Sequence, residues 1–410
     1  MRLADRLALT KPLAAAPEAP GSAGPSPLAA ALSALSRRVT PRPDVDTFAC
    51  NGPPPTLGDA LPGVAMASRS GQTTWVATSR HPIASLHGAF ALGPLEPFGP
   101  GGEIEHLFRL TGDPRLLGFA PDKALFLDIE ATGLEHGAGT LAFMIGLGHI
   151  DMADREVVVT QLILRDPDEE RAQLELLWDL VDAFPYLVSF NGKSFDLSVL
   201  QSRLVMNRLC TPREGELKLR PHLDLLHLSR SLYRGAFEDT RLQTLERKLL
   251  GFERVDDMPG ALAPSCFFHW LRDGDPRPLA MIAEHNRFDV LSMVALTRHL
   301  AEVSRPVGDA SRGSALWLNL ARTYLRRKEP EATLAVLDAP PTFVNPDELD
   351  EALSLEVVAA RRCKAEARQR QALERLAARH PDNEAHQRAL SRLAGRRTGP
   401  RSRARATTAS

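Results

Sequence analysis

A short apolar stretch that carries two acids is the feature that most constrains this chain. Residues 124–130 read ALFLDIE, which is apolar enough for a buried strand but includes Asp128 and Glu130. Because side chains alternate across a strand, these two carboxylates share one face. Like charges repel each other, and burial strengthens the repulsion. The strand must therefore either end in solvent or present its acids to a cation.

The bulk composition is that of a soluble protein with two or three domains. The chain has 410 residues, of which 43% are hydrophobic and 25% charged. Its net charge of −1 means that contact with nucleic acid has to come from local patches. The cysteines are scattered and form no CxxC pair, which disfavours a zinc site or a disulfide framework: Cys50, Cys210, Cys266 and Cys363. With no apolar stretch near ~20 residues and no apolar signal-peptide core, we expect a cytoplasmic protein without a membrane partner.

The two ends of the chain read as disordered. Residues 1–56 are rich in Ala, Pro and Ser, and such a segment buries too little apolar surface to offset its ordering entropy. Residues 395–410 form a basic tail. Between the first segment and the main domain, residues 57–119 predict a β-containing lead-in, with one strand in TTWVATSRHPI (73–83) and another in HGAFALG (87–93).

The main domain, residues 120–302, predicts a mixed α/β sheet with helices on its faces. The predicted elements, in chain order, are strands at 125–129, 140–150 and 156–165, a helix at 168–183, a strand at 186–190, a helix from about 195, a strand followed by a helix in 217–226, and a long helix that ends near 300. The sequence DMADRE joins the second and third strands as a hairpin.

Residues 313–394 predict helices throughout. Trp317, Leu320, Ala321 and Tyr324 follow a helical spacing that resembles the first helix of a tetratricopeptide repeat, with a plain helical hairpin as the alternative. This region is the candidate surface for a protein partner. From Arg361 to Arg405 there are fourteen Lys or Arg and four Asp or Glu, a difference of +10. Such a tail either contacts phosphates or is simply solvated.

Two further acidic positions accompany the first pair. In FNGKSFDLSVL, Asp196 follows a strand and a turn at Asn191 and Gly192; the alternative is that Asp196 or Ser194 only caps the next helix. In AEHNRFDVLSM, His285 and Asp289 are four residues apart and share one helix face. A pair that satisfies itself on the helix surface is the alternative there.

Four carboxylates from strand ends and a helix suit Mg²⁺ or Mn²⁺, because these cations prefer oxygen ligands. Two such ions held ~3.5–4 Å apart can activate a water and stabilise a leaving oxygen in phosphoryl displacement. A nearby histidine can orient or deprotonate that water.

Three motifs carry a family resemblance. FLDIEATGL, FNGKSFDLSVL and EHNRFDVLSM, in this order, resemble the exonuclease motifs of the DEDD superfamily of the ribonuclease H-like fold. More closely, residues 80 to 302 resemble the YprB-type ribonuclease H-like domain. The resemblance implies a metal-dependent 3′→5′ exonuclease that attacks the 3′-terminal phosphodiester of a nucleic acid with two metal ions.

The resemblance also implies roles for individual residues. The metal ligands and catalytic carboxylates would be Asp128, which bridges both ions, Glu130, Asp196, which acts through metal-bound water, and Asp289, which completes one site. His285 would activate the water. The His-type subgroup places its histidine five residues before the last Asp, where this chain has Glu284; the Tyr-type subgroup places a tyrosine four residues before it, where this chain has His285.

Four residues beside the motifs are candidates for substrate binding: Thr132, Gly133, Asn191 and Lys193. Thr132 and Gly133 would let the chain turn sharply and a ligand approach the backbone. Lys193 either contacts a phosphate or is a solvated loop residue. Asp224 precedes a helix and is expected to cap it.

Two alternatives to the exonuclease remain open. One is an endonuclease of the ribonuclease H type. The other is a catalytically weak nuclease fold that acts as an interaction scaffold through its C-terminal helices. The sequence leaves both DNA and RNA open as the nucleic acid.

Overall fold

The computed structural model describes residues 52–93, 104–133, 139–210, 217–255, 257–342 and 344–397. Most of the residues predicted as disordered, 1–56 and 395–410, lie outside the described residues. The prediction is wrong at 395–397, because these residues belong to the last helix of the chain, which extends to Arg397 and not to 394. The described chain divides into two compact units. The first contains the residues up to 228 together with 239–303, and the second contains 229–238 together with the residues from 304 onward.

A seven-stranded mixed sheet forms the centre of the first unit, in the order β1–β2–β7–β6–β5–β8–β9. Strands β5, β8 and β9 run parallel, and the other neighbours are antiparallel. The strand bounds are β1 (Val64–Ala67), β2 (Thr73–Pro82), β5 (Ala124–Ala131), β6 (Ala142–Asp151), β7 (Glu156–Ile163), β8 (Tyr186–Ser189) and β9 (His222–Asp224). The predicted mixed α/β sheet is confirmed, as is the hairpin of β6 and β7.

The region expected as a lead-in contributes strands to this same sheet. β2 pairs along its length with β7, from Trp75 opposite Ile163 to Pro82 opposite Glu156. The single strand predicted at 87–93 is wrong. Two short strands, β3 (Leu86–His87) and β4 (Phe90–Ala91), pair with each other instead. Gly88 lies between them with φ +65°, a conformation that turns the chain and that glycine adopts without strain.

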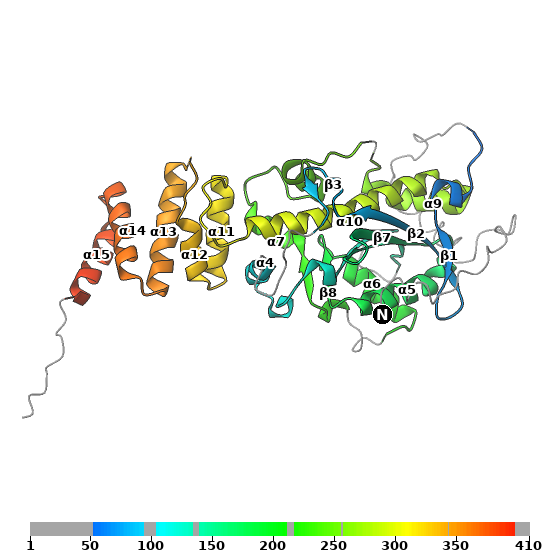
Figure 1. Cartoon of the computed structure of the whole chain (residues 1–410), viewed down its shortest axis with the longest axis horizontal. Helices are drawn as coiled ribbons and strands as arrows, with labels where there is room; N and C mark the ends of the chain where they lie inside the picture. The colour runs from blue at the N-terminus through cyan, green and yellow to red at the C-terminus, as the bar shows by residue number, and fades with distance from the viewer. Residues whose placement is uncertain are drawn as a thin grey trace, which may run out of the picture. The chain divides into compact units, whose positions relative to one another are not determined.

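Helices cover both faces of the sheet (Figure 1). α5 (Glu170–Ala183) and α6 (Asp196–Met206) pack on one face, and α9 (Ala263–Asp273) and α10 (Arg277–Val303) pack on the other. Further helices of this part of the chain include α3 (Leu57–Ala60), α4 (Ile104–Thr111), α7 (Leu225–Leu232), α8 (Leu242–Leu245) and the π-helical turn η6 (Glu246–Leu250).

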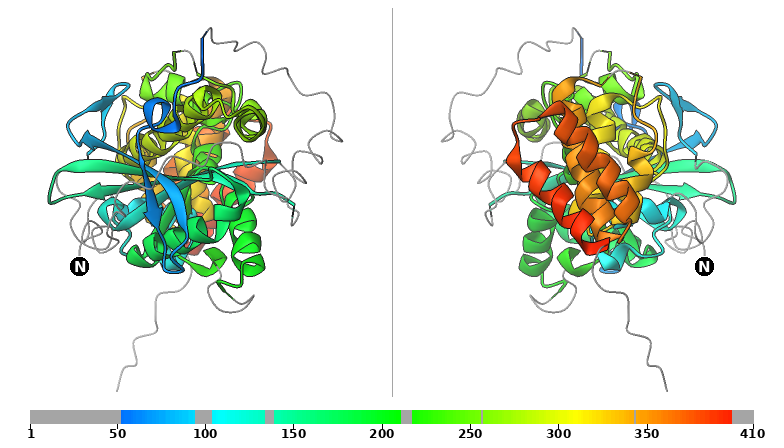
Figure 2. Two further views of the ribbon diagram at one scale, coloured as in Figure 1. Left: turned by 90° about the vertical axis from the view of Figure 1, so that its right-hand side faces the viewer. Right: turned by 90° about the vertical axis from the view of Figure 1, so that its left-hand side faces the viewer.

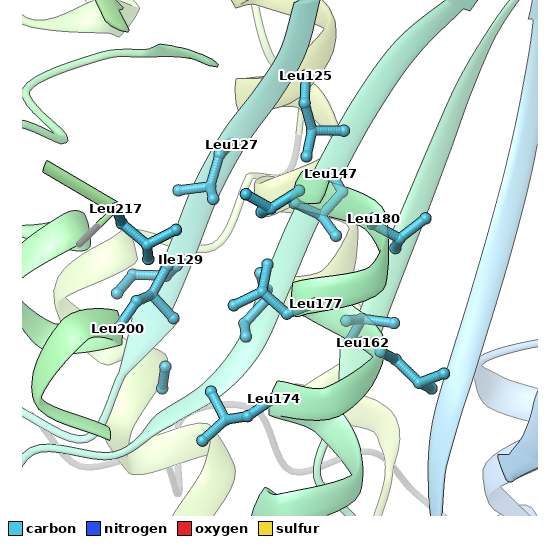
Figure 3. Packing of buried hydrophobic residues seen from close by; sticks show 14 of the residues in the cluster. Leu125, Leu127, Ile129, Leu147, Leu162, Leu174, Leu177, Leu180, Leu200 and Leu217 are labelled. Carbon is cyan, nitrogen blue, oxygen red and sulfur yellow. The ribbon is translucent and has the colours of Figure 1, made fainter. Parts of the chain in front are cut away.

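The alternation along β5 decides which side chains face which helices. Leu125, Leu127 and Ile129 belong to one buried cluster with Leu174 and Leu177 of α5, and Ile129 lies beside Leu200 of α6 (Figure 3). Burying each such side chain stabilises the fold by about 1.5–3 kcal/mol. Since successive residues point to opposite faces, the two acids of β5 must point to the side of α10. The core of one face thereby sets the direction of the acids on the other.

The second unit is helical, as predicted. Its helices pack one after another, as the labels of Figure 1 show, and Figure 2 (right) shows the same helices with α15 in front: α11 (Ser314–Arg326), α12 (Pro330–Leu337), α13 (Pro346–Arg362), α14 (Glu366–Arg379) and α15 (Glu384–Arg397). Trp317 and Tyr324 are among the largest fully buried side chains, and the Trp317 indole donates to the Val336 carbonyl at 2.9 Å. The tetratricopeptide resemblance stays a prediction. Within the described ranges, no helix is long and apolar enough to cross a membrane.

Candidate metal centre

The two acids of β5 lie on one face of the strand, as the sequence predicts. Asp128 accepts a hydrogen bond from the Asn286 side-chain amide of α10 at 2.8 Å. Glu130 is 9% exposed and sits where the pairing of β5 with β6 shifts register. The strand thus ends with both carboxylates directed at α10 rather than in open solvent.

The third acid, Asp196, is the first residue of α6. The capping alternative is not observed, because Phe195 occupies the N-cap and no side chain makes a capping bond there. Gly192 makes room for this carboxylate. A Cβ at that position would lie 2.8 Å from Asp196 Oδ2 and 2.3 Å from Ser189 Oγ, which is closer than real Cβ atoms come.

The fourth acid, Asp289, joins the group from α10 together with His285. One ligand atom from each of Glu130, His285 and Asp289 lies within 4.8 Å of the others. The pair does not satisfy itself on a free helix surface, since its side chains are 9% and 14% exposed and Glu130 faces them from β5. The predicted sharing of one helix face is confirmed.

The pKa values of three of these acids are raised because their negative charges are buried and lie close together. Burial raises the pKa of Asp128 well above its usual range, and the charges of Asp289, Asp196 and Glu130 raise it further. Burial and then the charges of Asp289 and Asp196 act in the same way on the pKa of Glu130. Burial followed by the charges of Asp224 and Asp289 raises the pKa of Asp196 to about 8. A divalent cation would reverse these shifts, because it favours the ionised form of its ligands.

Asp224 caps α7, as expected, by accepting from the Leu226 amide at 3.1 Å. It also accepts from the backbone amides of Asn191 at 2.9 Å and Lys193 at 3.1 Å. These bonds tie the turn before α6 to the end of β9. The side chains of Asn191 and Lys193 are exposed, and their contact with substrate stays a prediction.

Thr132 and Gly133 follow directly after β5. The Thr132 amide donates to the Leu141 carbonyl at 2.9 Å, and the Thr132 hydroxyl accepts from the Leu141 amide at 3.0 Å. Thr132 therefore fastens the end of β5 to the chain that enters β6. Gly133 is half-buried, and the role of both residues in substrate binding stays a prediction.

Two charged residues that sequence reasoning missed complete the surroundings. Asp257 accepts from His285 Nδ1 at 2.8 Å. Arg254 has a side chain only 5% exposed and forms ion pairs with Glu246 at 2.6 Å, with Asp257 at 3.3 Å and with Asp289. Both residues come from the loop GFERVDDMPG (251–260), whose only sequence signal is a group of charges between two helices.

Asn286 was also missed, although it lies inside the third motif. It is fully buried, and its oxygen accepts from the Gln161 side-chain amide at 2.9 Å while its NH₂ donates to Asp128. Gly146 of β6 allows this approach, because a Cβ there would lie 2.2 Å from Asn286 Oδ1. The neighbouring residues His285 and Asn286 therefore contact different carboxylates: His285 contacts Asp257, and Asn286 contacts Asp128.

Comparison with known proteins finds a family that this part of the chain resembles. Residues 125–301 match the family model described as RNase_H superfamily. The uncharacterized protein YprB of Bacillus subtilis is 30% identical over 261 residues, which are 63% of this chain and 60% of YprB. This confirms the predicted YprB-type resemblance, and the match spans less than two thirds of that relative's length.

A solved structure resembles the chain more distantly. The family B DNA polymerase from the hyperthermophilic archaeon Pyrobaculum calidifontis has 14% sequence identity and a TM-score of 0.35. The match covers 58% of this chain and 29% of that chain.

The donor set of the ribonuclease H-like domain fits a divalent cation. Asp128, Glu130, Asp196 and Asp289 supply carboxylate oxygens, the ligands that Mg²⁺ and Mn²⁺ prefer. The raised pKa values of the first three acids show that the negative charges repel one another. A divalent cation would remove this repulsion because it compensates the negative charge. Arg254 pairs with Asp289 and leaves the other three acids without a cationic partner among the ion pairs of the described residues.

Proposed function

We propose that this chain is a metal-dependent 3′→5′ exonuclease that hydrolyses phosphodiester bonds of nucleic acid. One observation carries the proposal: the charge of Asp289 on α10 raises the pKa values of the carboxylates of β5 and α6, so acids that are far apart in sequence lie close together. The match of residues 125–301 to the ribonuclease H superfamily supports the hydrolytic class, and the order of the three motifs supports the exonuclease type.

In this proposal, the acids of the chain hold the metal ions, and neighbouring residues keep those acids in position. Asp128 and Glu130, fixed by β5, and Asp289, fixed by α10, would hold Mg²⁺ or Mn²⁺, with Asp196 completing the set from α6. When bound, two such ions activate a water and stabilise the leaving oxygen of the phosphodiester. Asn286 keeps the Asp128 carboxylate in place through its 2.8 Å hydrogen bond. Burial keeps bulk water from screening these charges.

His285 stands beside the acids with its ring fixed by Asp257. Its Nε2 faces Asp289 Oδ2 at 3.5 Å. This nitrogen is placed either to orient a water, the role that the motif resemblance implies, or to bind an ion directly.

The test is a cleavage assay that separates the three functions considered. Purified full-length protein would meet 5′-labelled single-stranded DNA, single-stranded RNA and duplex DNA, and a closed circular single strand, each with Mn²⁺, Mg²⁺ or EDTA. The proposal predicts a ladder that shortens from the 3′ end, requires metal, and leaves the circle intact. Cleavage of the circle would establish the endonuclease alternative. No metal-dependent cleavage of any substrate would favour the scaffold alternative.

A further inference from the structure

We propose that His285 is itself a metal ligand and that, with Glu130 and Asp289, it forms a mixed nitrogen and oxygen site. Such a site selects a transition-metal ion such as Mn²⁺ or Co²⁺ over Mg²⁺. The inference rests on the proposed function and deepens it, because it names the class of ion that one half of the centre takes.

The spacing of the three groups is the first observation. Their ligand atoms lie within 4.8 Å of one another, and they come from two rigid elements, the end of β5 and one turn of α10. Nε2 of His285 and Oδ2 of Asp289 are 3.5 Å apart, which is too long for a good hydrogen bond. The nitrogen is therefore not committed to Asp289 and points into the space that the three groups share.

The orientation of the ring is the second observation. The Asp257 carboxylate lies 2.8 Å from Nδ1, and an ionised carboxylate can only accept a hydrogen bond. In the neutral ring, Nδ1 therefore carries the hydrogen and Nε2 presents its lone pair. Arg254 also approaches Nδ1, but at the longer distance of 3.2 Å. A carboxylate that holds the far nitrogen of the ring is the usual companion of a histidine that binds a metal.

Arg254 binds one of the two carboxylate oxygens of Asp289. The guanidinium pairs with Asp289 Oδ1, which leaves Oδ2 on the side of His285. Glu246 and Asp257 lie at 2.6 Å and 3.3 Å from the same guanidinium and balance its charge. Three carboxylates therefore compensate the positive charge of Arg254, and this charge does not oppose a metal ion in the space that the three groups share.

Gly260 leaves Nε2 uncovered. A Cβ at this position would lie 3.2 Å from Nε2, so any other residue would crowd the nitrogen. Imidazole nitrogen suits transition metals, whereas Mg²⁺ demands oxygen ligands and keeps its waters. A histidine whose nitrogen is oriented, uncovered and set between two carboxylates thus favours the transition-metal ion.

The test is pulsed electron paramagnetic resonance on the full-length protein saturated with Mn²⁺. We expect modulation from a directly bound ¹⁴N nucleus in the wild type. It should vanish in His285→Gln and persist in His269→Gln. His269 is a matched control because it also pairs with an aspartate four residues later, Asp273, at 3.0 Å, but on the surface of α9. In titrations, His285→Gln should weaken Mn²⁺ binding by roughly 10–100-fold and Mg²⁺ binding much less.

The outcomes separate this inference from the proposed function. Bound Mn²⁺ without ¹⁴N modulation in the wild type would overturn the ligand role of His285, and metal-dependent cleavage by the same sample would leave the nuclease standing. A wild type that neither binds Mn²⁺ nor cleaves would overturn both. Since the decisive spectrum is that of the wild type, a variant that fails to fold does not weaken the test.

Discussion

At the scale of single residues, the molecule concentrates negative charge where a hydrophobic core would be more stable. Asp196 is 6% exposed and has its pKa raised to about 8, first by burial and then by Asp224 and Asp289. Its ordinary value is 3.8. Below 3.8 both the folded and the unfolded chain hold the proton. Between the two values only the unfolded chain releases it, so the free energy of unfolding of the metal-free protein falls as the pH rises.

This predicts a pH-dependent effect of Asp196→Asn. In EDTA, the variant should be more stable than the wild type at pH 8.5, by roughly 1–3 kcal/mol, and the difference should shrink as the pH falls toward 4. Thermal unfolding followed by circular dichroism across this range measures it. A difference that does not change with pH would show that Asp196 is not held protonated in the folded chain.

Asn286 predicts a second effect at this scale. Asn286→Ala removes the bond to Asp128 and leaves Gln161 without one of its buried partners, so we expect a loss of about 1–3 kcal/mol in the free energy of unfolding. Asn286→Asp adds a further negative charge and should be less stable than Asn286→Ala in EDTA. Urea unfolding gives the order. Equal stability of the two variants would contradict the close approach of Asn286 to the acids.

Sequence reasoning found the acids of the site but not their partners. Asp128, Glu130, Asp196 and Asp289 stand out because an acid at the end of an apolar strand or on an apolar helix face is a local anomaly. Arg254 is an ordinary charge in a charged loop. Its carboxylate partners come from three places: Glu246 in η6, Asp257 three residues along the loop, and Asp289 in α10. No spacing in the sequence encodes the contact with Asp289.

At the scale of elements, glycines set how closely α10 approaches the sheet. A Cβ at Gly146 would lie 2.2 Å from Asn286 Oδ1, and one at Gly148 would lie 2.4 Å from Val290 Cγ1. Both glycines belong to β6 and face α10. The helix that carries His285 and Asp289 therefore packs closely against β6, because these two positions have no side chain.

Gly146→Ala tests this approach. The new methyl group must displace Asn286, and overpacking of this kind destabilises by roughly 1–3 kcal/mol. Gly139→Ala is the control, because a Cβ at Gly139 meets nothing within 4 Å. Chemical unfolding of both variants measures the difference. If Gly146→Ala unfolds like Gly139→Ala, α10 does not sit as close to β6 as described.

The elements themselves could be predicted to different degrees. β5, β6 and β7 have long apolar runs and a turn signal, so their strand character and the hairpin follow from local pattern. The pairing of β2 with β7 does not, because 74 residues separate Pro82 from Glu156 and pairing partners leave no periodic trace. The broken strand at 86–91 depends on the backbone of Gly88, which pattern alone did not reveal.

At the scale of the whole molecule, the chain crosses between its two compact units more than once. Residues 229–238 belong to the second unit, although they lie within the predicted domain 120–302. The side-chain amide of Asn319 in α11 donates to the carbonyls of Leu232 and Arg234 at 3.1 and 3.0 Å. The second unit is therefore built from two separate pieces of chain.

Truncation after Val303 should consequently damage more than the C-terminal helices. It leaves residues 229–238 without Asn319, and it exposes Tyr233, which is 5% exposed in the intact chain. We expect a lower melting temperature or aggregation relative to the full chain, measured by differential scanning fluorimetry and size-exclusion chromatography. Truncation after His380 removes α15 but keeps these contacts, and it should behave like the full chain. Equal behaviour of both truncations would contradict the division into these units.

The most direct test of the central claim compares cleavage by variants of the four acids. Each of Asp128→Asn, Glu130→Gln, Asp196→Asn and Asp289→Asn would be assayed with Mn²⁺ on the substrate that the wild type prefers. Asp273→Asn, 39% exposed on α9, is the matched control. We predict a loss of at least roughly 100-fold for each of the four, with wild-type rates for the control and none in EDTA. Undiminished cleavage by Asp128→Asn and Asp289→Asn, or cleavage that survives EDTA, would contradict the account.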